Sequence, residues 1–310
     1  MAAKDVAVSR WIRHFLEEEP PRAKSLCVTV LGDSIAPHGG IVWLGGLIKL
    51  LAPFGINDRL VRTSVFRLTG EGWLESRREG RRSLYALTAS GRRRFEHAHR
   101  RIYALPYAPW NGAWTLVLLP RTINGTGERT ELRGELEREG FGVISPGVFV
   151  HPSADTASLR DMLQALELED KVFVLSAKDL DELSTMPIRE LVGQCWKLDE
   201  LAEAHRRFIT RFEPITQIFR ERMAVNACQA FAVRSLLIHA YRRVILDDPH
   251  FPAEILPQDW AGHRASELCR ELYRSSCKQA EEYLAETLRE EDHAFTEAAP
   301  YLFERFGGLM

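Results

Sequence analysis

Residues 57–88 of this 310-residue chain read NDRLVRTSVFRLTGEGWLESRREGRRSLYALT, and this stretch decides the fold of the first third of the protein. Asn57 is a favourable N-cap residue, so a helix is predicted over 58–71. The apolar side chains of this helix fall at i, i+4 and i+7, on one face, at Val61, Val65 and Leu68. Gly70 and Gly72 are poor helix formers, which predicts that the helix ends there.

Residues 73–88 predict a β-hairpin that turns at Glu79-Gly80, because Gly80 tolerates a positive φ. Thr88 or Ser90 then caps a further helix. Upstream, residues 8–19 predict a short amphipathic helix, and 41–52 form an apolar segment. The segment that starts at Ser25 is ambiguous, since dense β-branched residues favour a strand and periodicity does not settle it. The order of helix, short turn, helix and basic hairpin predicts a winged helix-turn-helix.

Basic side chains gather on the predicted helix and around the hairpin tip. An α-helix fits the major groove of duplex DNA, where the planar guanidinium of arginine bonds base edges and phosphates. We expect the helix side chains to face bases or nearby phosphates, and the hairpin side chains to lie along the backbone or the minor groove. The candidate DNA-binding residues are Arg59, Arg62, Thr63, Ser64, Arg67, Arg77, Arg78, Arg81 and Arg82.

Positive charge is concentrated at one end of the chain, although the whole chain has a net charge of −2. Residues 1–104 hold 18 Lys and Arg against 10 Asp and Glu, a net charge of +8, whereas residues 105–310 carry −10. This division indicates that the N-terminal third meets a polyanion. Solvated helix faces of mixed sign are the alternative explanation.

The rest of the chain divides at the prolines near residue 106 and at residue 188. Residues 110–185 alternate strands and helices in the order βαββαβ, which predicts a ferredoxin-like domain. Residues 188–310 predict long helices, the first with a clear amphipathic repeat from Leu198 to Phe212. The predicted fold is therefore a multidomain α+β chain with a winged helix-turn-helix over 1–104, a ferredoxin-like centre over 110–185 and a C-terminal α-helical domain over 188–310.

Compartment and cofactor signals are few. The five cysteines contain no CxxC pair and are expected to be reduced core residues. The start of the chain lacks the order of a signal peptide, and the apolar stretch 41–56 is too short to span a bilayer. We therefore expect a cytoplasmic protein with no metal, no cofactor and no membrane contact.

Motifs over nearly the whole chain resemble those of one family. In chain order they are LGDSIAPHGG at 31–40, VWLG at 42–45, LAPFGINDRLVRTSVFRL at 51–68, EGWL at 71–74, GRRSLYALT at 80–88, GRRRF at 91–95, LLIHAYRRV at 236–244 and LPQDWAG at 256–262. These stretches resemble the PaaX family, which are repressors of phenylacetic-acid catabolic operons.

The resemblance carries several implications that composition and periodicity do not. It implies that the segment from Ser25 is helical and that the central domain is similar to the small nucleases of CRISPR adaptation. It implies a homodimer that binds double-stranded DNA at a pseudo-palindromic operator. The effector would be an aryl acyl-coenzyme A, phenylacetyl-CoA in the best-known members, and its binding would release the repressor from DNA.

An acyl-CoA effector needs basic groups for its phosphates and an apolar pocket for its ring. The last third of the chain offers such residues, although surface salt bridges and a dimer interface are alternative uses. The candidate ligand-binding residues are Arg234, His239, Tyr241, Arg242, Arg243 and Trp260, with Arg264 as a further basic group.

Two other functions compete with a repressor. A metal-dependent nuclease on the central domain would need an acidic ligand at the end of its first strand, where the chain reads Leu118-Leu-Pro-Arg-Thr. A protein-interaction adaptor would leave the N-terminal charge incidental. Because no catalytic motif is found, we predict that the protein is not an enzyme.

Overall fold

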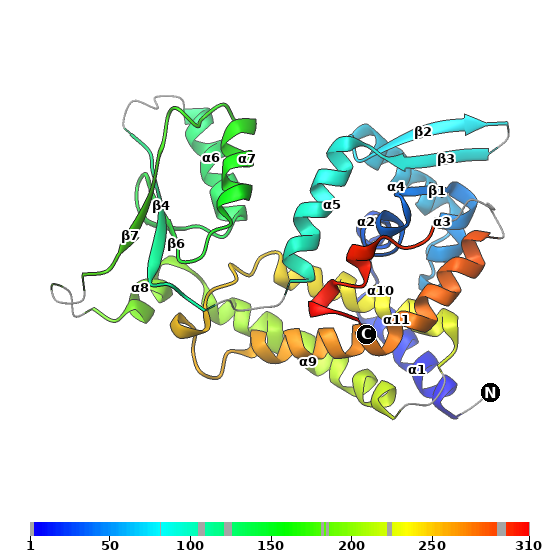
Figure 1. Ribbon diagram of the computed structural model, residues 1–310. Helices are drawn as coiled ribbons and strands as arrows, with labels where there is room; N and C mark the ends of the chain where they lie inside the picture. Colours follow the sequence, from blue (N-terminus) through cyan, green and yellow to red (C-terminus); the bar gives the residue numbers. More distant parts are fainter. Residues whose placement is uncertain are drawn as a thin grey trace. The chain divides into compact units, whose positions relative to one another are not determined.

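The computed structural model of the chain describes residues 3–80, 82–104, 109–120, 126–180, 183, 186–221, 225–289 and 296–309. Figure 1 shows a mixed α+β fold with two antiparallel sheets. By its contacts the chain forms two compact units. The first comprises Met1–Ala104, Arg207–Arg243 and Arg264–Met310, and the second comprises Leu105–Arg206 and Val244–His263. The three-part division at 104, 110–185 and 188 stays a prediction, but the contacts group the N-terminal third with helices of the last third.

The first unit opens with short helices and a small sheet. In chain order the elements are α1 (Ala3–Glu18), α2 (Ala23–Val30), the π-helical turn η1 (Leu31–Ile35), η2 (Ala36–His38), β1 (Ile41–Trp43), α3 (Leu44–Leu51), η3 (Ala52–Phe54), α4 (Asp58–Gly70), β2 (Leu74–Glu79), β3 (Arg82–Leu87) and α5 (Ala89–Ile102). The same unit contains most of α9 (Leu198–Arg220), α10 (Ala227–Ile245) and α11 (Ala261–Arg289), and the short turns η5 (Pro300–Leu302) and η6 (Arg305–Gly307).

The ambiguous segment from Ser25 is a helix, as the resemblance implied and against its strand propensity. Leu26, Cys27, Val30 and Leu31 are all buried. Their spacing of i, i+1, i+4 and i+5 places them on one helical face, which a strand would divide between two. Burial of this face therefore outweighs the intrinsic preference of the β-branched side chains.

Local capping signals fix α4 and α5. The Asn57 side chain accepts a hydrogen bond from the Leu60 backbone N–H at 3.0 Å, and the Thr88 hydroxyl accepts one from the Gly91 N–H at 2.9 Å. Between the two helices, β2 and β3 pair as the predicted hairpin, with Gly80 at a φ of 60° in its turn. The strand order β1-β3-β2 leaves β2 at an edge of the sheet.

The second unit contains a four-stranded sheet with helices packed on both of its faces. Its elements are β4 (Ala113–Leu118), α6 (Thr126–Arg138), β5 (Gly142–Ser145), β6 (Val148–His151), α7 (Thr156–Ala165), β7 (Phe173–Lys178), α8 (Ile188–Cys195) and η4 (Ala253–Ile255). The order βαββαβ confirms the prediction for the central segment, and the strands lie in the order β5-β6-β4-β7. Figure 1 shows α6 and α7 side by side against this sheet.

Alternating burial of the central strands explains the two cores of this unit. Val117 and Phe149 pack under α6 and α7. Trp114 and Val150 face a second apolar cluster, which α8, the start of α9 and residues 251–260 complete. The central strands β4 and β6 thus bury side chains on both faces, whereas the edge strand β7 is largely exposed.

Candidate nucleic-acid interface

One face of α4 is buried and the opposite face is a continuous exposed stripe. Val61, Ser64, Val65 and Leu68 are each at most 3% exposed. The exposed side chains recur at i, i+3, i+4, i+7 and i+8, which is the spacing of one helical face. They are Arg59, Arg62, Thr63, Phe66 and Arg67. The stripe presents three guanidinium groups, a hydroxyl and an aromatic ring to solvent.

The stripe corrects one sequence-based assignment and adds one residue. Ser64 was expected to contact DNA, but its side chain is 3% exposed and its hydroxyl donates to the Leu60 carbonyl at 2.8 Å. It lies on the buried face with Val61 and Val65. Phe66, which sequence analysis did not select, is 76% exposed. The signal for Phe66 was its position three residues after Thr63, on the polar stripe.

The polar groups of the stripe are only weakly engaged within the protein. The Arg62 Nε lies 2.7 Å from the Asp58 carboxylate, but the two side chains are 59% and 54% exposed. An ion pair this exposed contributes at most about 1 kcal/mol, so a phosphate or a base can replace it. The Thr63 hydroxyl donates to the Arg59 carbonyl at 2.9 Å, which leaves its oxygen and methyl group accessible.

The hairpin arginines are divided between its two faces. Cross-strand partners share a face, and successive residues alternate. Arg77 is paired with Leu84 and Glu79 with Arg82, whereas Arg78 is paired with Ser83. Arg77 and Arg82 therefore lie on one face and Arg78 lies on the other. A hairpin inserted into a groove would present guanidinium groups to both of its walls.

Two neighbouring arginines are held by aromatic rings. The Arg82 guanidinium carbon lies 5.9 Å from the centre of the Trp43 ring, which belongs to β1. The Arg94 guanidinium carbon lies 4.9 Å from the Trp73 ring. Stacking of this kind orients a guanidinium without neutralising its charge. Arg81 lies outside the described residues, so its assignment to the interface stays a prediction.

The predicted ligand residues of the last third do not form one pocket. Arg234, His239 and Tyr241 are at most 4% exposed and belong to the core of the first unit. The Arg242 guanidinium donates to Ser25, at 2.7 Å to its hydroxyl, and the exposed Arg243 pairs with Glu19 at 2.6 Å. Trp260 belongs to the second unit, where it contacts His205, and Arg264 pairs with Glu213. We correct the assignment of Arg234, His239, Tyr241 and Trp260, because each is at most 4% exposed and its side chain is not accessible to a ligand.

Burial also determines the ionisation of His239. Its Nδ1 lies 3.0 Å from the Thr29 hydroxyl. Desolvation, with the charges of Arg242 and Arg243, lowers the pKa of His239 to about 4. The ring is therefore neutral at pH 7 and acts as a structural hydrogen-bonding group.

A buried ionic cluster joins five segments of the first unit around Asp33. One oxygen of the Asp33 carboxylate accepts from the hydroxyls of Tyr103 at 2.6 Å and Tyr273 at 2.9 Å, and from Arg305 at 3.0 Å. The other oxygen lies 3.2 Å from Arg234. Asp33, Arg234 and Arg305 are each at most 2% exposed. The cluster connects η1, the end of α5, helices α10 and α11, and the C-terminal turn η6.

The carboxylate of Glu281 completes the charge balance of this cluster. It accepts from Arg234 at 2.5 Å and lies 2.8 Å from the His38 ring. Despite burial, these partners lower the pKa of Glu281 to about 2. Two guanidinium groups thus face two carboxylates in the interior, as a buried ionic cluster requires.

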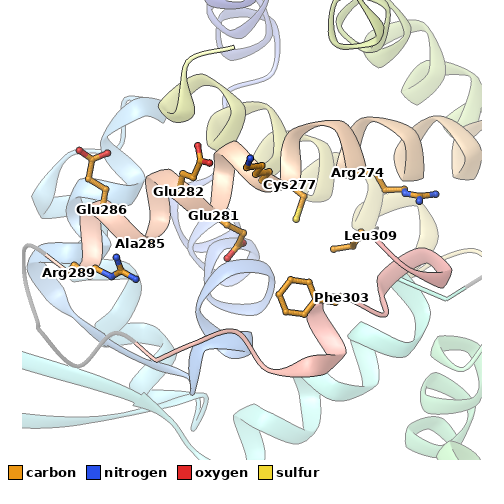
Figure 2. Close-up of a pocket in the computed structure, with 10 residues that line it drawn as sticks. Arg274, Cys277, Glu281, Glu282, Ala285, Glu286, Arg289, Phe303 and Leu309 are labelled. Atoms are coloured by element: carbon orange, nitrogen blue, oxygen red, sulfur yellow. The ribbon is translucent and has the colours of Figure 1, made fainter. Parts of the chain in front are cut away.

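A cavity of about 1120 Å³ opens beside α11, the helix that carries Glu281 (Figure 2). Its walls come from α11 and the C-terminal segment, with Phe303 and Leu309 opposite the helix. Three carboxylates and three basic groups line it. They are Glu281, Glu282, Glu286, Arg274, Lys278 and Arg289.

The described residues offer neither a metal site nor a membrane-spanning helix. There, no three His, Cys, Asp or Glu side chains lie together in a way that could hold a metal ion. None of the described helices is both long enough and apolar enough to cross a membrane.

Comparison with known proteins covers almost the whole chain. Residues 22–91 match the family described as PaaX-like protein, residues 107–188 match the PaaX protein central Cas2-like domain, and residues 196–286 match the PaaX-like protein C-terminal domain. The transcriptional repressor PaaX of Escherichia coli K12 is 35% identical over 300 residues, which is 96% of this chain and 94% of that protein.

A solved structure supports the same fold. An uncharacterised protein from Mycobacterium tuberculosis superposes with a TM-score of 0.54 over 84% of this chain and 98% of its own, at 24% identity. The Cas2-like description agrees with the ferredoxin-like strand order of the second unit. By these matches of sequence, the chain belongs to the PaaX family.

Proposed function

We propose that this protein is a transcriptional repressor of a phenylacetate catabolic operon that binds duplex DNA through a winged helix-turn-helix. The helix-turn-helix would consist of α3 and α4, and the wing would be the β2–β3 hairpin. The observation that carries the proposal is the exposed stripe of α4, with three arginines on a capped helix that is followed directly by an arginine-bearing hairpin. The name of the Escherichia coli relative supports the same function.

The two elements would read DNA in different ways. Arg62 and Arg67 project from the exposed face of α4 and would bond guanine edges or phosphates in the major groove. Phe66 and the Thr63 methyl group would contact thymine methyls. The hairpin arginines would contact phosphates, which adds affinity without sequence preference.

We propose that the repressor acts as a homodimer on a pseudo-palindromic operator. Strand β7 supports this, because it lies at an edge of the four-stranded sheet and exposes three successive apolar side chains, Phe173, Val174 and Leu175. An exposed apolar edge strand of this kind is a template for pairing with a second chain. Two copies would double the number of phosphate contacts.

We also propose that an aryl acyl-coenzyme A, such as phenylacetyl-CoA, releases the protein from its operator. Release requires that the ligand bind more tightly to a conformation that does not fit DNA. The protein is proposed to act without catalysis, although a Cas2-like domain occurs in its family.

Fluorescence anisotropy with labelled promoter DNA tests the proposal. The DNA would be the promoter of the genes that flank this one. Three phosphate contacts from each protomer of a dimer predict a slope of log K against log salt of roughly −5. Arg67→Ala should relax base preference, whereas Arg77→Ala should weaken binding to all sequences evenly. Binding without sequence preference and without salt dependence would refute the proposal and favour a protein-interaction adaptor.

The competing nuclease hypothesis is tested separately. The protein is incubated with duplex and single-stranded DNA in Mg²⁺ or Mn²⁺ and the products are run on a denaturing gel. We expect intact DNA. Cleavage that is lost on addition of a chelator would show that the protein is an enzyme.

A further inference from the structure

A second cavity, of about 460 Å³, lies wholly within the first unit. Helix α5 forms one wall, residues 32–39 form another, and the C-terminal segment at Ala299 and Tyr301 forms the third. Leu87, the last residue of β3, also lines it. The cavity therefore touches the base of the hairpin and the C-terminal segment together, and its volume is within the range of small-molecule sites.

Aromatic side chains make the walls of this cavity flat and apolar. The rings of His99 and Tyr301 meet edge to face with centroids 5.0 Å apart. Phe95 lies against Gly32 so closely that a Cβ built on Gly32 would be 2.6 Å from the Phe95 ring. A phenyl group inserted between such walls makes further stacked or edge contacts. The walls thus favour a planar aromatic ligand over a branched aliphatic one.

The electrostatic balance of the cavity is positive. Arg92 and Arg100 line it with a single carboxylate, that of Glu96. Burial lowers the pKa of His99 to about 4, and the nearby charges of Arg305 and Arg100 lower it further than Asp33 raises it. The His99 ring is consequently neutral at pH 7, which lets it stack on an aromatic ring, while the two guanidinium groups give the lining a net positive charge.

The larger cavity in Figure 2 is less suited to an aromatic ligand. Its lining offers the ring of Phe303 beside three carboxylates and three basic groups. The smaller cavity is lined by the rings of Phe95, His99 and Tyr301. Because a phenyl ring gains stacked or edge contacts with other rings, the smaller cavity is the better candidate.

We propose that the cavity between α5 and the C-terminal segment binds a small aromatic anion, and that this ligand is the effector of the repressor. The ring would lie between Phe95, His99 and Tyr301, and the anionic group would contact Arg92 and Arg100. The free aryl carboxylate has this ring and charge together. The aryl end of a coenzyme A thioester shares the ring and a carbonyl oxygen that can accept from an arginine, but its thioester is neutral and its negative charges lie on the phosphates. The inference rests on the proposed function for its regulatory consequence, but ligand binding itself does not depend on DNA.

The cavity lies beside contacts that support the β2–β3 hairpin. The Arg92 guanidinium donates to the Gly39 carbonyl at 2.9 Å, and the Ala299 N–H donates to the Pro37 carbonyl at 2.9 Å. Both contacts fasten a wall of the cavity to the segment that leads into β1, which pairs with β3. A ligand that moves Arg92 away from Gly39 would thus change the support of the hairpin. Regulation follows when the conformation with the Arg92–Gly39 contact and the conformation without it differ in ligand affinity.

Isothermal calorimetry on the full-length protein tests the site directly. The probes are phenylacetate, phenylacetyl-CoA and benzylamine, which keeps the ring but reverses the charge. We expect binding of at least one of the first two and none of benzylamine. Equal binding of benzylamine, or binding of neither anion, would overturn the proposal. Binding of the thioester alone would identify the coenzyme A ester as the source of the aryl group.

Three variants locate the binding. Ala299→Leu fills the cavity and Arg100→Gln removes a positive charge, and each should weaken binding of the anionic probe by at least about tenfold. Arg93→Gln is the matched control, since Arg93 is exposed on the same helix and does not line the cavity. Thermal unfolding verifies that the variants are folded. If all three variants bind as the wild type does, the site is elsewhere.

The same variants separate this inference from the proposed function. Promoter binding without ligand should be unchanged in Arg100→Gln, and release by the ligand should need at least tenfold more of it. If the wild-type protein does not bind DNA but binds the aromatic anion in this cavity, the proposed function fails and the site stands. If DNA binding and release are normal in Ala299→Leu and Arg100→Gln, the function stands and the site is refuted.

Discussion

Asp33→Ala tests how strongly the buried ionic cluster stabilises the first unit. The Asp33 carboxylate is 2% exposed and accepts three hydrogen bonds on one oxygen, from Tyr103, Tyr273 and Arg305. Its removal leaves Arg305 with the Asp33 backbone carbonyl and the Tyr273 hydroxyl. It also leaves Arg234 with the carboxylate of Glu281.

The expected loss of unfolding free energy in Asp33→Ala follows from the removal of one partner of a buried ion pair. Such a loss costs about 3–5 kcal/mol, because the guanidinium groups stay buried with too little opposite charge. This is a large part of a typical unfolding free energy of about 5–15 kcal/mol. For a unit of this size each kcal/mol shifts Tm by about 2–4 °C, so we expect a fall of roughly 6–20 °C.

Differential scanning calorimetry of the full chain measures this change. Asp58→Ala is the matched control, because Asp58 pairs with Arg62 while 54% of its side chain is exposed, and its loss should cost at most about 1 kcal/mol. Asp33→Asn keeps the shape of the side chain and should be destabilising, but less so than Asp33→Ala. A Tm for Asp33→Ala equal to that of Asp58→Ala would refute the reasoning that the cluster holds the unit together.

Three further predictions concern DNA binding, pH and assembly. Phe66→Ala should weaken operator binding by roughly tenfold in anisotropy titrations with little change in Tm, because the ring is 76% exposed; unchanged affinity would exclude Phe66 from the interface. His239 has a pKa of about 4 in the folded protein against 6.5 in the unfolded chain. The free energy of unfolding measured in urea should therefore fall as pH drops from 6.5 toward 4, by about 2 kcal/mol at pH 5. His239→Gln should lose this part of the pH dependence, and a variant with the wild-type pH profile would contradict the prediction. Phe173→Lys should shift the protein from dimer to monomer in light scattering, whereas Ser176→Lys on the same strand should do so less; two dimeric variants would place the interface elsewhere.

Local signals were sufficient to predict the elements that carry the candidate DNA interface. Asn57 and Thr88 cap their helices as expected, and Gly80 turns the hairpin. Each of these depends on neighbours within a few residues, so the chain sequence contains the whole cause. The exposed side of α4 follows from the same periodicity, and the error at Ser64 arose because its hydroxyl suggested a polar position although its spacing from Val61 places it on the buried face.

The ligand residues could not be predicted in this way, because their partners are far away in sequence. Arg234 was selected as a basic residue of the last third, yet it neutralises Asp33, 201 positions earlier. His239 likewise bonds Thr29. Buried charge is identified only when its counter-charge is known, and no helical repeat in the last third indicates where Asp33 lies. His99 was missed for the same reason, since its aromatic neighbour Tyr301 comes from the C-terminal segment.

The first unit contains both the N-terminal helices and the helices of the last third, which suggests how an effector site and a DNA site in it can be coupled over a short distance. If the DNA-binding helices were a separate domain on a linker, a ligand bound elsewhere could act on them only through the relative placement of domains. Here the Asp33 cluster ties η1 to α10, α11 and η6, and the adjacent cavity has walls from both ends of the chain. A ligand in that cavity would alter the packing of the same core that supports α4 and the hairpin. The regulatory coupling would then be a change in the internal packing of one unit, and its strength is limited by the difference in ligand affinity between two packings.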